Sequence, residues 1–411
     1  MTITGIFSIQ NTDKRLINTK NRLSLLILFL IPWMLIQCDE DPGIAGSGFI
    51  DKAAEVYTDS LKIDDIQTTE IKAFTGNQPH FSAGEYNDPL FGNIRAVALL
   101  RPSITRTSLD TIVDGAEAKI QFAVATSSAY GDTTQPVNFE LRSVNQVWRA
   151  NSWRRDSIPS LGSDIYQQFT LNMEDTIEVN LSDAWLQELK TIFNSEDDNR
   201  DSLYRYTYNG LSLVATNSGR IMPFNRAGTQ FMIKNPDDTV FTSLGLQGSA
   251  FGMDFTPSNA AAQDQSSLIA PYKQTLSLKP DIDEQSLGSQ NMSKVELELN
   301  EARNELDNLP ANHVRPDIPA FYIYQLFDED LDLTIIENPD YTAAIDSASR
   351  SLRVNITNFA NQVLFEETPD VRFYLVPRSD NGIIYTSMLY NQNATSQFPR
   401  LLITGVKNTS D

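Results

Sequence analysis

The chain has 411 residues and a formal net charge of −21 at pH 7. A surface this acidic repels phosphate backbones, so nucleic acid is excluded as an expected partner. A single cysteine excludes an internal disulfide, and the length exceeds one comfortable hydrophobic core, which predicts two domains.

The first predicted element is a short apolar run at residues 23–38 that ends at the only cysteine. Four basic residues precede it and Pro32 interrupts it, so it is too short to span a bilayer comfortably and is typical of a signal peptide. Its end, Leu35–Cys38, resembles the lipobox of bacterial lipoproteins, in which signal peptidase cuts before a diacylated cysteine. The resemblance implies a signal peptide over residues 1–37 and lipidation of Cys38, which would anchor the protein in the outer membrane. The alternative is an ordinary membrane anchor that ends at Cys38.

An acidic and glycine-rich tether is expected over residues 38–53. Asp39, Glu40 and Asp41 resemble the export signal that sends Bacteroidota lipoproteins to the outside of the outer membrane. A solvated linker would have the same composition. The resemblance implies a lipid-anchored outer-membrane protein that faces the cell exterior.

Beyond the tether, stretches of alternating apolar and polar residues are frequent and long amphipathic helices are nearly absent, which predicts an all-β protein. Ser182 can cap one short helix over residues 183–193, where apolar residues recur at helical spacing. Strands are expected at residues 54–58, 63–69, from 92 onward, 115–124, 137–141, 208–215 and 230–233.

A distinctive motif, Gly-x-Tyr-x-Asp-Pro-x-Phe-Gly, occupies residues 84–92. It resembles a family of uncharacterised Bacteroidota outer-membrane lipoproteins that share a domain of unknown function. The Tyr-Gly-Asp turn at residues 130–132 and the strand that follows Gly210 resemble the same family, and the matches extend from about residue 50 to 405. The resemblance implies a cell-envelope lipoprotein, and it implies no specific activity.

The second half of the chain repeats the order of the first at a spacing near 175 residues. This repeat predicts two tandem jelly-roll-like β-sandwich modules, each with a short helix, and the order also resembles the DNRLRE-type jelly-roll modules of bacterial surface proteins. The matched segments are residues 98–102 with 276–280, 118–122 with 293–297, 179–183 with 354–358 and 231–233 with 401–403.

The predicted modules span residues 54–236 and 237–407, followed by a tail at 408–411. The junction is expected at the Asn-Pro-Asp-Asp sequence of residues 235–238. Two long loops are expected at residues 245–265 and 301–310, and loops of this length are usually functional or disordered.

No catalytic constellation can be assembled from the sequence. His80 and His313 are the only histidines, and no nucleophile elbow, phosphate-binding glycine loop or zinc-type cysteine spacing is present. The sequence therefore predicts neither an enzyme nor a cofactor. Acidic pairs could hold calcium or hydrolyse glycosides, although such pairs in an acidic chain can simply be solvated loops. The calcium candidates are Asp328, Asp330 and Asp332.

Residues 145–155 combine two tryptophans with three arginines in an otherwise acidic chain. Trp148 and Trp153 could stack on sugar rings, with Arg149 and Arg154 beside them; the alternative is that the tryptophans cover one end of a sandwich. The sequence thus predicts a non-catalytic binding or scaffold module. A carbohydrate-binding surface module and a glycan hydrolase with paired carboxylates are the alternatives, and a glycan or an outer-membrane protein is the expected partner.

Asp followed by Ser or Thr and an aliphatic residue occurs seven times, where ordinary composition predicts about two. The pattern resembles the O-glycosylation sequon of exported Bacteroidota proteins, although Asp-Ser and Asp-Thr are also common in turns. The candidate acceptors are Ser60, Thr111, Ser157, Thr176, Ser202, Thr239 and Ser347.

Overall fold

The computed structural model describes residues 54–105, 107–258, 262–272, 274–282, 291–326, 338–366, 372–378 and 381–408. Thr58–Gly405 form one compact unit. The predicted lipidation site, the export signal and the three calcium candidates lie outside the described residues. Within the described ranges, no helix is long and apolar enough to cross a membrane.

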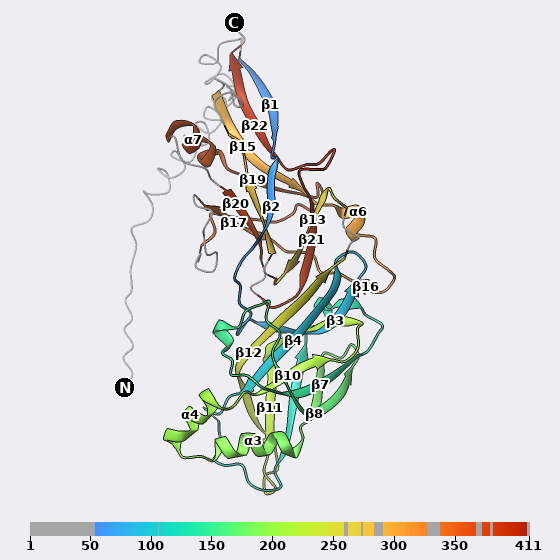
Figure 1. The fold of residues 1–411 in the computed structure, drawn as a ribbon, viewed down its shortest axis with the longest axis vertical. Helices are drawn as coiled ribbons and strands as arrows, with labels where there is room; N and C mark the ends of the chain where they lie inside the picture. The colour runs from blue at the N-terminus through green and yellow to red at the C-terminus, as the bar shows by residue number, and fades with distance from the viewer. Residues whose placement is uncertain are drawn as a thin grey trace, which may run out of the picture. The chain divides into compact units, whose positions relative to one another are not determined.

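Strands make up 52% and helices 12% of the structure, which confirms the predicted all-β class (Figure 1). The strands of the first half are β1 (Ala54–Lys62), β2 (Asp65–Glu70), β3 (His80–Asp88), β4 (Gly92–Pro102), β5 (Glu117–Val124), β6 (Tyr130–Asp132), β7 (Val137–Val144), β8 (Leu161–Leu171), β9 (Thr176–Asn180), β10 (Leu211–Ala215), β11 (Arg220–Lys234) and β12 (Thr242–Pro257). Those of the second half are β13 (Gln265–Ala270), β14 (Gln274–Lys279), β15 (Asn291–Asn300), β16 (His313–Val314), β17 (Phe321–Leu326), β18 (Tyr341–Ala343), β19 (Ser351–Asn355), β20 (Arg372–Pro377), β21 (Tyr385–Tyr390) and β22 (Arg400–Asn408). The helices are α3 (Asp183–Phe193), α4 (Asp197–Tyr206), α6 (Arg303–Leu306) and α7 (Thr357–Glu366).

The two halves share one topology. In the first half, β5 pairs with β9 and β11, and a second run of strands has the order β12-β4-β10-β7-β8. In the second half, β15 lies between β19 and β22, and the second run has the order β2-β14-β20-β17-β18. Strand β2 was expected in the first module but pairs with β14, so it belongs to the sheet of the second. Every segment matched in the sequence repeat therefore occupies an equivalent strand. The fold is two tandem β-sandwich modules, as the repeat predicts.

The core of the first module is aromatic. Phe81 and Phe122 each pack against Phe224, with ring centroids 5.4 and 5.2 Å apart. Helix α3 covers this core and begins as expected, because the Ser182 hydroxyl accepts a hydrogen bond from the Trp185 amide. Trp185 of α3 is fully buried.

Two further segments differ from expectation. Residues 245–257, expected in a long loop, belong to β12, which pairs with β4 and β11 and extends the first module's sheet past residue 236. At Gly252 the strand passes so close to the backbone of Ser157 that a Cβ would lie 1.6 Å from the Ser157 carbonyl oxygen. The glycine therefore permits close packing of β12 and does not mark a loop. Helix α4 was not expected, because its sequence is mostly polar.

The family-like motif forms a buried cluster at the turn between β3 and β4. The Asp88 carboxylate accepts hydrogen bonds from the backbone amides of Leu90 (2.8 Å) and Phe91 (3.0 Å) and from the hydroxyl of Tyr130 (2.7 Å). Arg315, from the second half, donates to it through Nε (3.0 Å) and Nη2 (2.8 Å). Both side chains are almost completely buried. The motif therefore supplies the carboxylate, Asp88, of a buried ion pair that joins the two modules.

The backbone of the second module also joins the first at this place. Strand β16 pairs with β6 of the first module's sheet, with His313 opposite Asp132. The Arg315 guanidinium lies 5.2 Å from the ring centroid of Phe91. Gly92 ends the motif with φ +102°, and a Cβ there would lie 2.3 Å from the carbonyl oxygen of Thr256, so only glycine suits this position.

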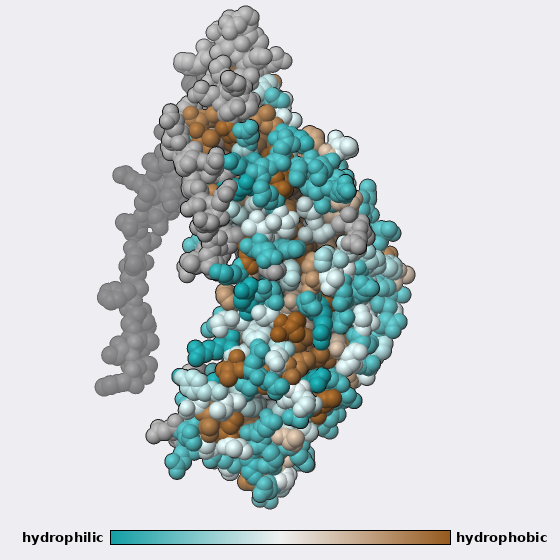
Figure 2. All heavy atoms as spheres, in the orientation of Figure 1, coloured by the Kyte–Doolittle hydropathy of each residue, from teal (hydrophilic) through white to brown (hydrophobic). Residues whose placement is uncertain are grey.

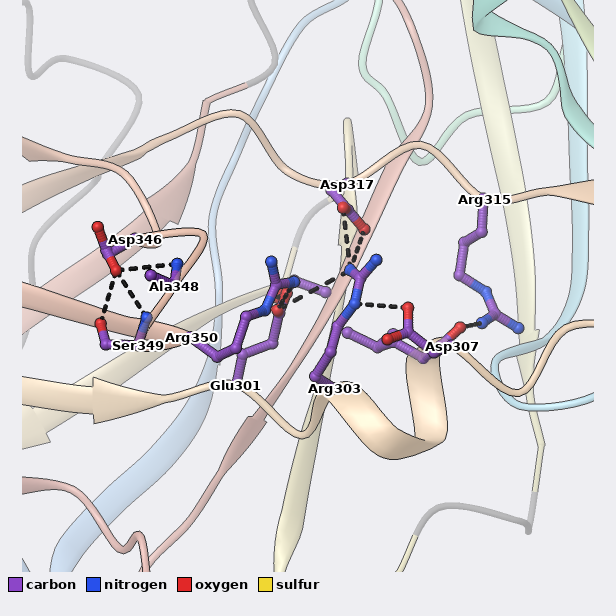
Figure 3. A network of polar contacts seen from close by, with 11 residues as sticks. Glu301, Arg303, Asp307, Arg315, Asp317, Asp346, Ala348, Ser349 and Arg350 are labelled. Carbon is purple, nitrogen blue, oxygen red and sulfur yellow. Dashed lines mark hydrogen bonds and ion pairs between the residues drawn. The ribbon is translucent and has the colours of Figure 1, made fainter.

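The expected loop at residues 301–310 contains α6 and is held by ion pairs (Figure 3). Arg303 contacts Asp307 (2.5 Å) and Asp317 (3.0 Å), and Glu301 forms a buried ion pair with Arg350. The segment is therefore an ordered part of the second module. Hydrophilic side chains cover much of the described surface on the face shown in Figure 2, with smaller hydrophobic patches between them.

Candidate functional site

A pocket of about 580 Å³ lies in the first module, where β4 and β12 meet α4 and the segment at residues 148–152. A polar extension of about 480 Å³ shares Ile104, Thr105 and Asp201 with it. The pocket is lined by basic, aromatic and amide side chains, among them Arg101, Trp148, Arg149, Tyr204, Arg205 and Gln247.

The local backbone makes room for Arg101 at the end of β4. The register between β4 and β12 shifts between Leu246 and Gly248, which leaves Gln247 as an extra residue beside the pocket. Gly210 has φ +68°, and a Cβ there would lie 2.8 Å from Cγ of Arg101. A bulge and a glycine thus create the space that this arginine occupies.

Arg101 is 8% exposed. Its guanidinium lies 4.8 Å from the ring centroid of Trp148 and 5.9 Å from that of Tyr204. Nε and Nη2 are covered and have no hydrogen-bond partner among the described residues. Burial lowers the pKa of Arg101, yet a guanidinium remains protonated at neutral pH. Arg101 is therefore a buried positive charge, compensated within the described chain only by aromatic faces.

The side chains around Arg101 are themselves held in place. The hydroxyl of Tyr204 donates a 2.5 Å hydrogen bond to the carbonyl oxygen of Pro102, and Nε1 of Trp148 donates a 2.7 Å hydrogen bond to the carbonyl oxygen of Asn209. The pocket wall is therefore preorganised by contacts that do not involve a ligand.

The rim of the pocket is also basic. Arg149 and Arg205 are exposed and line it, against one lining carboxylate, Asp201. Three arginines with one aspartate give this place a local positive charge in a chain whose net charge is −21.

Only half of the site expected from the sequence lines this pocket. Trp148 and Arg149 do, whereas Trp153 and Arg154 do not. Arg154 instead forms an exposed ion pair with Asp156, with Nη2 2.7 Å from Oδ2. The two tryptophans are 3% and 8% exposed and pack in a cluster with Leu99, Val144 and Ala250. They present no open face on which a sugar ring could stack, because both are buried in this cluster and Arg101 lies over the ring of Trp148.

Sequence reasoning missed Arg101, Tyr204, Arg205 and Gln247. A signal for Arg101 was present, since it directly follows the apolar run Ala96–Leu100, and β4 is buried from Ala96 to its end. A charged residue at the end of such a run is rarely buried without a partner.

A second pocket, of about 470 Å³, borders α3 and α4. Burial raises the pKa of Glu188, a hydrogen bond from the Tyr166 hydroxyl (2.8 Å) lowers it, and the nearby charge of Asp164 raises it, with a net upward shift. This pocket therefore holds two carboxyl groups, one of which keeps its proton to a higher pH than usual.

The histidines do not meet. Nδ1 of His80 donates to the carbonyl oxygen of Asn381 (3.0 Å) and Nδ1 of His313 to that of Ala311 (2.9 Å). In the part of the chain that the structure describes, no group of three or more potential metal ligands occurs.

The seven candidate O-glycosylation acceptors are spread over both modules. Six of them are exposed, and Ser157 is half-buried. Some of the sequon aspartates also stabilise turns: Asp346 accepts hydrogen bonds from the backbone amides of Ala348 (3.0 Å) and Ser349 (2.7 Å). Glycosylation of these residues stays a prediction.

No protein-family model matches the chain, and no curated protein matches it. Among solved structures, the Macrobrachium rosenbergii nodavirus is similar at 8% identity and a TM-score of 0.17, over 87% of this chain and 91% of that chain. The CBM22 tandem domain of Paenibacillus barcinonensis Xyn10C has 8% identity and a TM-score of 0.13, over 85% and 93%. The tandem CBM51 modules of a Streptococcus pneumoniae family 98 glycoside hydrolase have 9% identity and a TM-score of 0.10, over 85% and 99%. Likenesses this low assign no function.

Proposed function

We propose that the protein is a lipid-anchored outer-membrane lipoprotein of the Bacteroidota type, facing the cell exterior, and that it acts as a non-catalytic module that binds a saccharide in the Arg101 pocket. The observation that carries the binding proposal is a buried arginine without a carboxylate partner in the described chain, at the wall of a preorganised pocket. The cysteine and acidic residues at positions 38–41 support the location.

The lining of the pocket suits a hydroxyl-rich ligand. Asn77 Nδ2 donates to Asn151 Oδ1 (2.9 Å) and holds that amide at the rim. Nδ2 of Asn151 and the amide of Gln247 face the pocket as polar groups, and Trp148 contributes an apolar edge. A few polar groups converging on a partly aromatic cavity are typical of small-molecule sites. Together with its polar extension, the pocket has room for more than a single sugar ring.

We expect Gln247→Trp to abolish saccharide binding, because an indole at the bulge would occupy the mouth of the pocket. A glycan array on the wild type identifies ligands, and isothermal titration with a bound oligosaccharide then compares the variants. Gln167→Trp is the matched control, since Gln167 is exposed on β8 and does not line the pocket. Equal affinity in wild type and Gln247→Trp would place the site elsewhere.

Incubating the protein with the same oligosaccharides tests the enzyme alternative. Glu188 and Asp164 in the second pocket are the carboxyl pair that a glycan hydrolase would use, because a carboxyl with a raised pKa can act as a general acid. We expect no new reducing ends after prolonged incubation with bound oligosaccharides. Product that disappears in Glu188→Gln would overturn the non-catalytic proposal.

We expect Cys38→Ala to release the protein from the membrane, because several acyl chains on one cysteine provide the stable anchoring. Membrane fractionation and intact mass of the native protein measure this, and the same mass reports any glycans on the predicted sequons. Membrane retention of Cys38→Ala would contradict the anchor.

Replacing Asp39, Glu40 and Asp41 with alanine should keep the protein in the membrane but protect it from protease added to whole cells.

A further inference from the structure

The Arg101 pocket contains a charge that the described part of the protein leaves unbalanced. Elsewhere, buried arginines are compensated: Arg315 forms a 2.8 Å ion pair with Asp88, and Arg220 donates to the carbonyl oxygens of Thr133, Leu171 and Asn172. Nε and Nη2 of Arg101 have neither kind of partner among the described residues. A buried ion without a partner is costly, so its retention at a pocket wall points to a partner supplied from outside.

The surroundings of the pocket fit an anion. Arg149 and Arg205 add positive charge at the rim, and Asp201 removes one unit. The acidic surface of the whole protein would repel an anion at a distance, but at physiological salt the charge of groups beyond about 8 Å is largely screened. Close to the pocket, the three arginines therefore determine the sign of the potential.

We propose that the ligand of this pocket is a saccharide that carries a carboxylate, with its negative charge placed beside Arg101. This inference rests on the proposed saccharide-binding function and specifies its ligand class. The carboxylate would balance Arg101 in the pocket wall, while the amides of Asn151 and Gln247 would contact the sugar hydroxyls. A small organic acid carries the same charge but lacks those hydroxyls. Contacts to the sugar hydroxyls should therefore make an acidic saccharide bind more tightly than a small organic acid.

Titration calorimetry with matched pairs of probes tests the carboxylate. Trigalacturonic acid is compared with its methyl ester, and 3′-sialyllactose with lactose; acetate and malate test the acid without the sugar. We expect at least one acidic saccharide to bind, its neutral counterpart to bind at least about tenfold more weakly, and neither organic acid to bind measurably. The affinity should fall as salt is raised.

Substitutions locate the charge. We expect Arg101→Gln to weaken binding of the acidic saccharide at least about tenfold, and Arg149→Gln or Arg205→Gln to weaken it about two- to fivefold, since exposed charges are screened. The two rim variants keep the test valid if Arg101→Gln does not fold, because both side chains are exposed. Arg154→Gln, in the same segment but outside the pocket, is the matched control and should leave the affinity unchanged.

The outcomes separate this inference from the proposed function. If neutral saccharides bind as well as acidic ones and Gln247→Trp abolishes both, the carboxylate is wrong and saccharide binding in the pocket stands. If an acidic saccharide binds but none of the three pocket arginines affects it, the placement beside Arg101 is wrong. If acetate or malate bind as tightly as the saccharide, the ligand is a small acid. If no saccharide on the array binds, both proposals fail.

Discussion

Asp88→Asn is expected to lower the free energy of unfolding by about 3–5 kcal/mol, because it leaves the buried guanidinium of Arg315 without its counter-ion. The substitution preserves the size of the side chain and an oxygen for the backbone amides of Leu90 and Phe91, so the loss reports mainly the missing charge. Chemical denaturation followed by tryptophan fluorescence measures it. Because the ion pair joins the two modules, the unfolding transition of the variant should also become broader or split in two.

Two further variants define the origin of this loss. Asp156→Asn, in the partly exposed ion pair with Arg154 (side chains 17% and 48% exposed), should lower stability far less than Asp88→Asn. The double variant Asp88→Leu with Arg315→Met should recover part of the loss, since removing both charges avoids a buried unpaired one. A single substitution at Asp88 no more harmful than that at Asp156 would mean that the modules do not depend on this ion pair.

The ion pair also predicts how stability depends on pH. Burial by itself raises the pKa of Asp88, but hydrogen bonds from Arg315, the Phe91 amide and Tyr130 outweigh it and hold the pKa below its usual range. A carboxyl whose pKa is depressed by folding stabilises the protein above its unfolded-state value of about 3.9 and loses that contribution as the pH falls through the folded-state value. Wild-type stability should therefore fall below about pH 4, and Asp88→Asn should lack this component.

Trp185→Ala is expected to lower the free energy of unfolding by about 3–5 kcal/mol, because it leaves a large cavity in the first module. Trp185 is fully buried and stacks on Phe231, with ring centroids 5.2 Å apart and planes 7° from parallel. The stacking packs α3 against strand β11, so this change also removes one of the contacts that hold the helix. Urea denaturation with far-ultraviolet circular dichroism measures both the stability and the helix signal.

Position 147 offers the control for this prediction. Val147 is 53% exposed, and Val147→Ala should change stability only slightly. Trp185→Phe should restore part of the loss, since a phenyl ring can still face Phe231. A loss at Trp185 as small as that at Val147 would mean that α3 is not held by this stack.

The local features of the fold were readable from the sequence, whereas the partners across the fold were not. Ser182 and the spacing of apolar residues after it specify α3 because capping and helical periodicity are local. That Asp88 pairs with a residue 227 positions away could not be predicted, because no local pattern records which distant arginine is buried beside it.

The pocket was missed for a related reason. The tryptophans of residues 145–155 drew attention as surface aromatics, but their burial depends on Leu99 and Ala250, which come from other strands. Helix α4 supplies Tyr204 and Arg205, yet its sequence is mostly polar and lacks the apolar periodicity that predicts a helix. Only the assembled fold places these residues around Arg101.

The shared topology of the two modules suggests an ancient duplication followed by divergence. In the sequence repeat, Lys279 of β14 corresponds to Arg101 of β4, and it lies opposite Asp65 of β2, whose charge it opposes. The repeated position thus lies opposite a carboxylate in one module and, among the described residues, only against aromatic rings in the other, so equivalent corners of one fold differ in how their cation is balanced.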